Sequence, residues 1–472
     1  MRLYDTLTRE IKELKPIDND TFRFYCCGPT VYGPAHIGNF RTFVMQDVFR
    51  RALELGGVPT KHVRNITDVD DKTIRDSQAA GQTLTEFTQG WTEKYHEDCN
   101  ALNCLLPDVE PGAVDHIPQQ ITMIEKLITN GHAYAAADGS VYFKISSYPE
   151  YGALSHLGER ELDLGKTQEV RASDADEYEK DSIADFVLWK SRRDEDGENY
   201  WQSPWGEGRP GWHIECSAMI LEHLGESFDL HSGGEDLIFP HHENEIAQSK
   251  CSTEGDFAAH WFHPTHLLVD GKKMSKSLGN FYVLGDLIEK GHTPAEVRYT
   301  LIGGHYRKQL NFTSDSLHAS SEALGKLLKA ERALAEKAGV ADDETPSYES
   351  LIGLEDKGLF DNAWKGLNED MNTQRAIGAM FGALKRAQNE TDILTQWKGL
   401  HFMLHAFGIK LPEVEVEVEI EVPTEIQKLA EARWQARADK DWAKSDELRD
   451  ELKELGWVVK DGKEGWDLEP LN

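Results

Sequence analysis

The sequence predicts an α/β fold with a parallel sheet, followed by an α-helical half and a small C-terminal module. Residues 22–66 contain an aromatic segment, a glycine-proline turn, an amphipathic segment and a second short apolar segment, in that order. The order strand, turn, helix and strand is how an α/β unit with parallel strands begins. From about residue 315 onward, apolar residues recur at helical spacing instead, which predicts a set of packed helices.

The individual elements of the first half follow from local composition. The aromatic run over 22–32 predicts a strand that ends at a Gly-Pro turn. A helix with one apolar side is expected over 40–56, and a second short strand over 61–66. Strand character returns over 261–269, and a polar loop is expected over 271–277 immediately after it.

The C-terminal third contains two further patterns. Leu324, Leu327, Leu328 and Leu334 share one helical face. Between the prolines at 412 and 423, five glutamates alternate with valine and isoleucine. Alternation is typical of a strand, but five like charges on one face repel one another, so we expect an extended linker or an edge strand. A last small module is expected from residue 424.

Composition excludes several classes of protein. The chain has 472 residues, of which 39% are hydrophobic and six are cysteines. These values exclude a disordered chain, a collagen-like chain and a coiled-coil rod, and no run approaches the 18 apolar residues of a membrane span. The N-terminus lacks the apolar core of a signal peptide. Six cysteines are too few for a disulfide scaffold of this length, so we expect a cytoplasmic protein with no membrane partner.

The charge of the chain is strongly negative but unevenly placed. Lys and Arg number 51 and Asp and Glu number 83, a net charge of −32, which alone argues against a nucleic acid partner. Residues 210–249 hold eight acidic residues and no lysine or arginine. The same segment contains Cys216, His213, His223, His231, His241 and His242. Acids and soft ligands without basic residues predict a cation here, either a metal ion or a substrate ammonium group.

A zinc site is one interpretation of this segment. His241 and Glu245 are four residues apart, so on a helix they share one face and can share a metal. Cys216 and the distant Cys27 could add two thiolates, and two Cys with one His and one Glu suit zinc by ligand softness. Cys26 is expected to face away from Cys27, because neighbours on a strand face opposite sides. The alternative is a solvated His–Glu pair.

Two other segments are candidates for phosphate binding. Residues 270–277 contain Lys272, Lys273 and Lys276 with two serines, which suits a polyphosphate, although a solvated basic turn is the alternative. His36-Ile37-Gly38-Asn39 stands immediately before the first expected helix. Glycine permits close approach of the backbone there and the helix N-terminus favours an anion. A lone histidine at such a position is more often structural.

In combination these motifs resemble a known family. His36-Ile37-Gly38-Asn39 resembles the first signature of class I aminoacyl-tRNA synthetases, and Lys273-Met274-Ser275-Lys276-Ser277 reproduces their second signature in full. Four further segments are similar to cysteinyl-tRNA synthetases in particular: Cys27-Gly28-Pro29-Thr30-Val31-Tyr32, Arg64-Asn65-Ile66-Thr67-Asp68, Gly211-Trp212-His213-Ile214-Glu215-Cys216-Ser217 and Phe239-Pro240-His241-His242-Glu243-Asn244-Glu245. The similarity runs across most of residues 1–315 and continues more weakly to the end.

The resemblance implies an activity and its partners. L-Cysteine would be activated with ATP to cysteinyl-adenylate and pyrophosphate, and the cysteine would then pass to the 3′ end of tRNA(Cys). One zinc ion per chain would bind the substrate thiolate and reject serine. ATP would bind with Mg²⁺, and the enzyme would be a monomer. No protein nucleophile is needed, because the cysteine carboxylate attacks the α-phosphate of ATP.

The resemblance also assigns roles to residues of this sequence. It implies that zinc is bound by Cys27, Cys216, His241 and Glu245. The cysteine pocket would be lined by Gly28, Thr67, Trp212 and Asp236, and Asp236 would neutralise the substrate ammonium. ATP would be held by His36, Gly38, Asn39 and Lys276, with catalysis by His36, Asn39, Lys273 and Lys276.

The same resemblance implies a division into domains. The class I Rossmann-type parallel sheet would be split by an insertion and followed by an α-helical bundle. The expected ranges are 1–105 for the first half of the catalytic domain, 106–205 for the connective insertion, 206–262 for the second half, 263–315 for the lysine signature and stem-contact region, 316–410 for the tRNA-binding helical bundle, 411–423 for the acidic linker and 424–472 for the anticodon-binding module.

Three positions, in two segments, depart from the family pattern. Asn39 stands where the first signature usually has a second histidine; asparagine can donate a hydrogen bond but cannot carry charge. Gly112 and Val114 stand where the family usually has Arg and Thr, and we assign no role to that segment.

Two other functions would use some of the same motifs. A homologous ligase that joins cysteine to an amino sugar would share the zinc site and both signatures but lack an anticodon-reading domain. A zinc-binding RNA-interaction protein would not need the phosphate signatures. In 424–472, Arg433, Arg437, Lys440 and Lys444 are spaced as one stripe of a helix. This stripe suits tRNA, whereas the alternative is a solvated face paired with Asp439 and Asp441.

Overall fold

The computed structural model describes residues 1–18, 20–157, 185–275, 278–341, 344–412, 422–461 and 465–470. The chain divides into two compact units, Met1–Pro412 and Glu413–Asn472, and each unit is described by itself. Within these described ranges, every helix is too short or too polar to cross a lipid bilayer. The acidic segment expected to be a linker or edge strand lies, over 413–421, outside the described residues.

A four-stranded parallel sheet forms the centre of the first unit. Its order is β13-β11-β3-β4 and all three neighbouring pairs are parallel, which confirms the predicted fold class. The elements of residues 1–101, in chain order, are β1 (Arg2–Asp5), β2 (Glu10–Glu13), β3 (Phe22–Cys26), α1 (Ile37–Leu55), β4 (Thr60–Arg64), α2 (Asp71–Ala80) and α3 (Leu84–Ala101). The expected strand over 22–32 is therefore shorter, because the chain leaves the sheet after Cys26.

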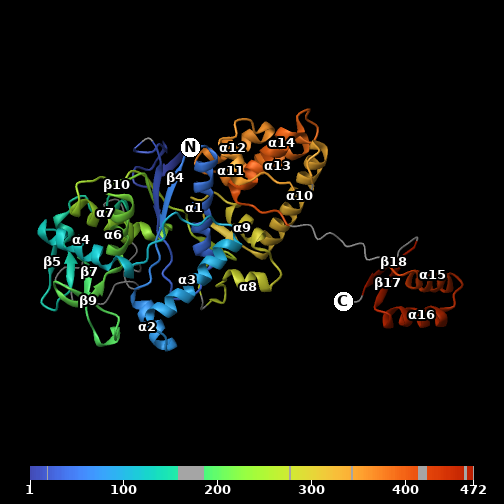
Figure 1. Cartoon of the computed structure of the whole chain (residues 1–472), viewed down its shortest axis with the longest axis horizontal. Helices are drawn as coiled ribbons and strands as arrows, with labels where there is room; N and C mark the ends of the chain where they lie inside the picture. The colour runs from blue at the N-terminus through green and yellow to red at the C-terminus, as the bar shows by residue number, and fades with distance from the viewer. Residues whose placement is uncertain are drawn as a thin grey trace. The chain divides into compact units, whose positions relative to one another are not determined.

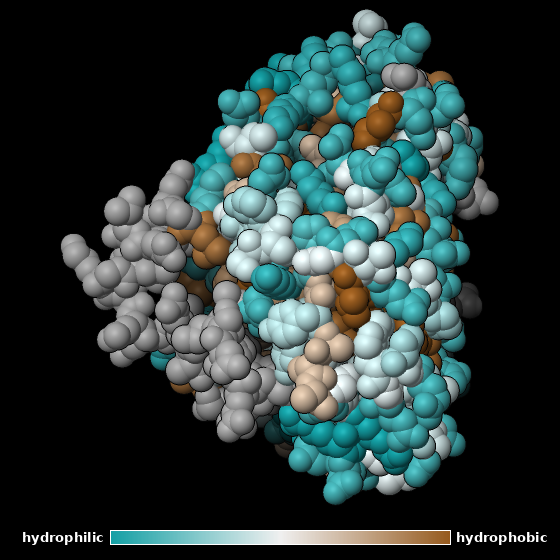
Figure 2. Space-filling model, turned by 90° about the vertical axis from the view of Figure 1, so that its left-hand side faces the viewer, coloured by the Kyte–Doolittle hydropathy of each residue, from teal (hydrophilic) through white to brown (hydrophobic). Residues whose placement is uncertain are grey.

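An insertion separates the two halves of this sheet. It contains α4 (Ile117–Thr129) and a five-stranded sheet in the order β5-β6-β7-β9-β8. The strands are antiparallel and comprise β5 (Ala133–Ala135), β6 (Val141–Phe143), β7 (Phe186–Ser191), β8 (Trp201–Ser203) and β9 (Gly206–Pro210). Figure 2 shows the insertion side of the molecule as a largely hydrophilic surface with scattered apolar spots.

The second half of the sheet follows the insertion. Its elements are α6 (Trp212–Leu224), β10 (Ser227–Phe228), β11 (Leu230–Ser232), α7 (Glu243–Ser252), β12 (Phe257–Ala258) and β13 (Trp261–Phe262). β11 pairs with β3 on the side opposite to β4. The strand order thus reverses at β3, and in open parallel sheets ligands bind beyond the carboxyl ends of the strands at such a point.

Helices cover both faces of the sheet. In Figure 1, α1 lies on one side of the sheet, toward the helical half, and α6 and α7 lie on the other. Cys26 belongs to the hydrophobic core on the α1 side, whereas Cys27 belongs to the core that includes Cys216 and Ile246. The expectation that these two cysteines face opposite sides is confirmed.

The remainder of the first unit begins with a small sheet and two helices. The expected strand over 261–269 is broken into β13 and β14 (Leu267–Val269), and the expected polar loop contains β15 (Lys272–Lys273), which pairs with β14. α8 (Leu284–Glu289), α9 (Pro294–Ile302) and β16 (Leu310–Phe312) follow. The predicted helices then appear as α10 (Ser314–Ala338), α11 (Tyr348–Leu351), α12 (Asp361–Asn368), α13 (Thr373–Ala387) and α14 (Ile393–Phe407).

The second unit contains α15 (Thr424–Ala438), α16 (Trp442–Glu454) and a hairpin of β17 (Trp457–Asp461) and β18 (Trp466–Pro470). The prediction of one continuous basic helical stripe is wrong. Arg433 and Arg437 lie on α15, Lys440 lies in the turn that follows with a φ of 62°, and Lys444 lies on α16. Arg433 is buried, whereas Lys440 and Lys444 are exposed.

A buried histidine in the central sheet is poorly satisfied. His62 of β4 is 3% exposed and its ring stacks on Phe24 at 4.5 Å between centroids. Neither ring nitrogen has a hydrogen-bond partner among the described residues. Burial, reinforced by the nearby Arg64 and Arg50, lowers the pKa of His62 well below its usual range.

Replacing His62 with phenylalanine should stabilise the protein by about 1–2 kcal/mol, because it removes two unsatisfied buried nitrogens and keeps the ring stack. In the native protein, the unfolded chain binds a proton at His62 below about pH 6.5 that the folded chain does not bind. Native stability should therefore fall as the pH drops below that value, and the His62→Phe variant should lose this part of the decline. Thermal unfolding at pH 7.5 and 5.5 measures both effects. A variant that is less stable at pH 7.5 would contradict the argument.

Candidate active site and metal centre

The candidate site lies beyond the carboxyl ends of β3 and β11, where the strand order reverses. Cys27 directly follows β3, and its backbone N–H donates to the carbonyl of Ser232, the last residue of β11. The segment after β11 contains Gly233 and leads to His241, which precedes α7, and to Glu245 in the first turn of α7. The topology therefore places the end of β3 beside the beginning of α7, more than 200 residues later in the sequence.

Four predicted metal ligands meet at this point. One donor atom from each of Cys27, Cys216, His241 and Glu245 lies within 4.8 Å of the other three, and all four residues are buried. Nε2 of His241 is 3.0 Å from Oε1 of Glu245, and Sγ of Cys27 is 3.9 Å from the same oxygen. Two sulfurs, one imidazole and one carboxylate can bind a divalent metal ion of intermediate softness.

A second group of donors overlaps with the first. Cys27, His231, His242 and Glu245 also lie within 4.8 Å of one another. His231, on β11, hydrogen-bonds Oε2 of Glu245 at 2.8 Å, so each oxygen of that carboxylate faces a different histidine. The sequence showed both additional histidines but nothing in their spacing singled them out.

Further histidines extend from the cluster through hydrogen bonds. Nε2 of His242 is 3.3 Å from Sγ of Cys27, and its Nδ1 is 2.7 Å from Nε2 of His263. Nδ1 of His263 is 2.7 Å from the Thr6 hydroxyl. On the other side, Nδ1 of His241 is 2.9 Å from Nδ1 of His213. Because this bond uses Nδ1 of His241, its Nε2 is the nitrogen that faces the cluster. Such contacts orient metal ligands.

The buried donors shift one another's pKa values. Burial raises the pKa of the Cys27 thiol well above its usual range, and the neighbouring Cys216 adds to this. The hydrogen bond from Cys27 lowers the pKa of Cys216 to about 6 despite burial, with His241 contributing. Burial would raise the pKa of Glu245, but His231 and His241 lower it to about 2. Burial would lower the pKa of His241, but Glu245 and Cys216 raise it to about 10. Without a metal, the cluster thus contains anionic donors beside a protonated imidazole.

Of the predicted pocket residues, Trp212 contacts a member of the cluster and Gly28 directly follows one. The ring of Trp212, the first residue of α6, stacks on His241 at 4.2 Å between centroids. Gly28 donates its backbone N–H to Oδ1 of Asn65 at 2.8 Å, and Nδ2 of Asn65 donates to the Thr67 hydroxyl at 3.0 Å. Asp236 is exposed and lies on the short 3₁₀ turn over Glu235–Leu237. Asn65 lies within the segment 64–68, but nothing in the sequence pattern indicated this linking role.

The first signature segment has a local structural role. Nδ1 of His36 accepts from the backbone N–H of Asn39 at 3.1 Å, and Oδ1 of Asn39 accepts from the backbone N–H of His36 at 3.1 Å. This reciprocal capping box starts α1 at Ile37, earlier than the expected residue 40. Asparagine at position 39 can therefore complete the capping box, because its amide oxygen accepts the hydrogen bond from the His36 backbone.

The two signature segments are physically linked. His36 forms an isolated antiparallel bridge with Val283, and Ile37 donates its N–H to the carbonyl of Tyr282 at 3.0 Å. A Cβ added at Gly38 would lie 3.0 Å from Cε of Met274, the second residue of the other signature. Lys273 is exposed on β15. Lys276 and Ser277 lie outside the described residues.

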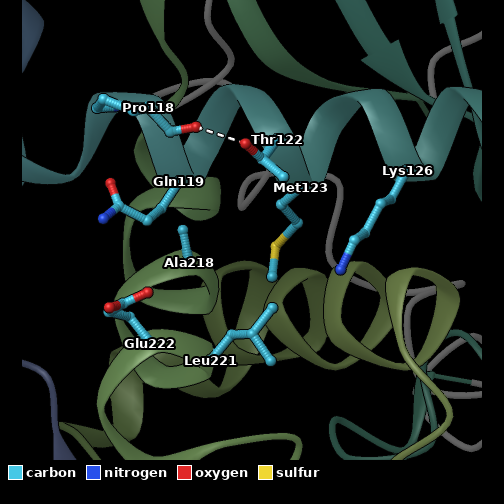
Figure 3. Close-up of a pocket in the computed structure, with 8 residues that line it drawn as sticks. All are labelled: Pro118, Gln119, Thr122, Met123, Lys126, Ala218, Leu221 and Glu222. Carbon is cyan, nitrogen blue, oxygen red and sulfur yellow. Dashed lines mark hydrogen bonds between the residues drawn. The ribbon is translucent and has the colours of Figure 1, made fainter.

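A separate hollow does not include any of the predicted site residues. It has a volume of about 400 Å³ and lies between α4 and α6. Figure 3 shows Met123 and Lys126 of α4 pointing toward Leu221 and Ala218 of α6, with the Thr122 hydroxyl bonded to the Pro118 carbonyl at 2.9 Å. This hollow is therefore separate from the candidate metal site.

Comparisons with known proteins identify two matching families. Residues 13–322 match the family described as tRNA synthetases class I (C) catalytic domain, and residues 420–466 match the cysteinyl-tRNA ligase anticodon binding domain. A cysteine–tRNA ligase of Opitutus terrae is 51% identical, over 100% of this chain and 99% of the relative. One from Chlamydia trachomatis is 42% identical, over 99% of each. The fold is similar to that of Mycobacterium tuberculosis methionyl-tRNA synthetase in complex with methionyl-adenylate (TM-score 0.58, 15% identity, 82% of this chain and 89% of that chain).

Gly28 lies so close to the backbone of Asn65 that a larger residue would not fit there. A Cβ at residue 28 would lie 1.7 Å from the carbonyl oxygen of Asn65, so Gly28→Ala should displace the segment between Cys27 and Thr67. We expect a loss of about 1–3 kcal/mol in unfolding free energy. The matched control is Gly33→Ala, because a Cβ there meets nothing within 4 Å. Urea unfolding compares them, and equal stability of the two variants would show that the segment adapts.

Proposed function

Since the chain belongs to the cysteine–tRNA ligase family, we propose that Cys27, Cys216, His241 and Glu245 bind one zinc ion that selects its substrate by the thiolate. The enzyme activates L-cysteine with ATP to cysteinyl-adenylate and pyrophosphate, and it then transfers cysteine to the 3′ end of tRNA(Cys). The observation that supports the zinc proposal is the convergence of these four buried donors within 4.8 Å.

The donor set fits zinc better than Mg²⁺ or Ca²⁺. Two thiolates and an imidazole are soft or borderline ligands, which disfavours Mg²⁺ and Ca²⁺. A bound zinc ion supplies a soft Lewis acid to which a thiolate binds strongly and a hydroxyl weakly. Selection by this difference would explain discrimination between cysteine and serine without an editing step. All four donors come from one chain, which is consistent with a monomer holding one zinc ion.

We propose that the cysteine pocket lies against this centre. Trp212 stacks on His241 and so stands beside the metal ligands. Thr67 is joined to Gly28 through Asn65, and Gly28 directly follows Cys27. Asp236 is assigned to the substrate ammonium, whose positive charge would offset part of the acidity of 210–249. These residues hold and orient the substrate, and none of them needs to form a covalent bond with it.

The activation step needs donors for phosphate oxygens. Because Nδ1 of His36 accepts a hydrogen bond from Asn39, the ring proton of the neutral His36 is on Nε2, which makes that nitrogen a donor. Oδ1 of Asn39 is occupied by the His36 backbone, so its Nδ2 is the donor side. We assign His36, Gly38 and Asn39 to ATP, and Lys273 and Lys276 to the departing pyrophosphate with Mg²⁺.

We assign tRNA recognition in part to the second unit. Lys440 and Lys444 are exposed, and Lys444 forms an ion pair with Glu447 at 2.8 Å. Trp442 between them is 59% exposed, as a base-stacking residue would be. Arg433 is buried, so we assign it to the packing of the module and not to tRNA contact. Arg437 is half-buried on the same helix. The match of residues 420–466 to an anticodon-binding domain favours this function over an amino-sugar ligase.

The cysteines favour a reducing compartment for this work. All six are free and buried. A thiol-rich centre of this kind requires reduced cysteines, which is the condition of the cytoplasm. We therefore propose that the enzyme acts there.

Removal of the metal should abolish recognition of cysteine. Cysteine-dependent ATP–pyrophosphate exchange should fall by roughly a hundredfold or more after chelation and return when zinc is added. Cys216→Ser should show the same loss together with loss of bound zinc. Cys251→Ser is the matched control, because Cys251 is buried on α7 but outside the cluster. Full exchange by the metal-free enzyme, or exchange with serine equal to that with cysteine, would reject the proposed selection.

Loss of Lys440 and Lys444 should affect only the tRNA step. The double variant Lys440→Ala and Lys444→Ala should raise the KM for tRNA several-fold and reduce the salt dependence of charging, because each phosphate contact contributes about one unit of slope. Cysteine-dependent exchange should be unchanged. Lys453→Ala, an exposed lysine at the far end of α16, serves as control. Charging kinetics identical to those of the native enzyme would remove these lysines from the interface.

A further inference from the structure

A line of hydrogen bonds leads from the Cys27 sulfur to the N-terminal segment of the chain. Nε2 of His242 is 3.3 Å from that sulfur, and Nδ1 of the same ring is 2.7 Å from Nε2 of His263. Nδ1 of His263 is in turn 2.7 Å from the Thr6 hydroxyl oxygen. All four ring nitrogens of these two buried histidines are engaged, whereas both nitrogens of the buried His62 lack a partner among the described residues. The function described so far assigns no role to Thr6, His242 or His263.

The fold holds the two rings in fixed positions. His242 is fully buried, and a Cβ added at Gly233 would lie 2.7 Å from its Cε1, so the glycine leaves the space that the ring occupies. His263 directly follows β13, and its ring lies nearly parallel to that of Trp261 at 6.0 Å between centroids. Thr6 directly follows β1, and its backbone N–H donates to the Trp261 carbonyl at 3.0 Å. The Thr6 hydroxyl is therefore anchored beside the strand end that leads to His263.

Metal binding fixes the direction in which the hydrogens of this line run. A sulfur that binds a metal ion has lost its proton and can only accept a hydrogen bond, so Nε2 of His242 must carry a hydrogen. A neutral imidazole with its hydrogen on Nε2 accepts at Nδ1. His263 therefore donates from its Nε2 to that nitrogen and accepts at its own Nδ1. The Thr6 hydroxyl supplies the hydrogen there, and His242 can donate to a thiolate without taking up a proton.

We propose that His242 is a positioning residue that donates a hydrogen bond to the Cys27 thiolate, and that His263 and the Thr6 hydroxyl hold it in the tautomer that does so. The inference rests on the proposed function, which places a zinc ion on Cys27. A hydrogen bond from a fixed ring holds the sulfur in place and stabilises its negative charge, and outer partners of this kind contribute substantially to metal affinity. A hydroxyl in the N-terminal segment thereby acts on the metal centre through two rings.

The alternative is that His242 is itself a metal ligand. It belongs to the second group of donors, with Cys27, His231 and Glu245. However, its Nε2 faces the Cys27 sulfur at hydrogen-bonding distance, and the first group supplies four donors without it. The two roles differ measurably, because loss of a ligand changes the number of donors on the metal, whereas loss of a hydrogen bond changes only the donor strength of one sulfur.

The test combines two substitutions in a double-mutant cycle. Thr6→Val removes the hydroxyl and keeps the shape of the side chain, whereas Thr6→Ser keeps the hydroxyl. His242→Phe removes both nitrogens and keeps a ring. The full-length, metal-free proteins are titrated with Zn²⁺ against a chelator, and with Co²⁺ to record the sulfur-to-metal charge-transfer absorption. His62→Phe is the matched control, because it replaces a buried histidine outside both donor groups.

His242→Phe should weaken Zn²⁺ binding roughly tenfold to a hundredfold and still bind one ion per chain. Without the N–H the thiolate donates electrons more strongly, so the Co²⁺ charge-transfer band should move to longer wavelength. Thr6→Val should change both quantities in the same direction by a smaller amount, and Thr6→Ser and His62→Phe should resemble the native protein. Thr6→Val should have no further effect in the His242→Phe background, because the hydrogen bond through which it acts is then absent.

Several outcomes would overturn the inference. Equal effects of Thr6→Val in the native and His242→Phe backgrounds would mean that Thr6 acts through general packing, and a Thr6→Ser variant as impaired as Thr6→Val would exclude the hydroxyl. Native affinity with an unshifted band in His242→Phe would exclude the hydrogen bond, and a changed Co²⁺ coordination number would make His242 a ligand. If His242→Phe does not fold, His263→Phe interrupts the same line and replaces it in the cycle. A native protein that binds no zinc would instead refute the proposed function itself.

Discussion

The arrangement of this enzyme depends on one buried carboxylate, that of Glu245. It is fully buried, and its two oxygens face two different histidines at 2.8 and 3.0 Å. His231 belongs to β11, whereas His241 precedes α7. A buried charge is tolerated only when it is paired in this way, so the carboxylate constrains the sheet and the helix to one relative placement. That placement is also the one that brings Cys27 and Cys216 within reach of the same point.

The first signature segment is held by backbone contacts to the segment that follows the second signature. The backbone of residues 36–37 pairs with that of residues 282–283, although the insertion and half of the catalytic sheet lie between them in sequence. The capping box of His36 and Asn39 also starts α1, so the side chains that we propose for ATP binding also organise the helix. The segment that follows the lysine signature is thereby anchored to the start of α1.

The sequence was sufficient for features that depend on local pattern and on recognised motifs. It predicted the parallel α/β sheet, the helices of the C-terminal half and the opposite orientations of Cys26 and Cys27. These features follow from the spacing of apolar residues and from the alternation of side chains along a strand, which are local properties. It could not show that Cys27 and Cys216 meet, since that contact depends on the pairing of β3 with β11. The roles of Asn65, His231 and His242 likewise come from tertiary contacts. The prediction of a single basic helical stripe was wrong because the local spacing is helical but the chain turns at Lys440, between two helices.

The separation of β3 from β11 has a consequence for synthesis of the chain. About 200 residues lie between these paired strands, so at typical translation rates β3 and Cys27 leave the ribosome roughly 10 to 40 s before their partner strand. During that interval β3 has β4 on one side and an open edge on the other. The adjacent thiols of Cys26 and Cys27 are then not yet covered by their complete cores. The nascent chain therefore depends on its surroundings to keep both thiols reduced and the edge unpaired until α7 has emerged.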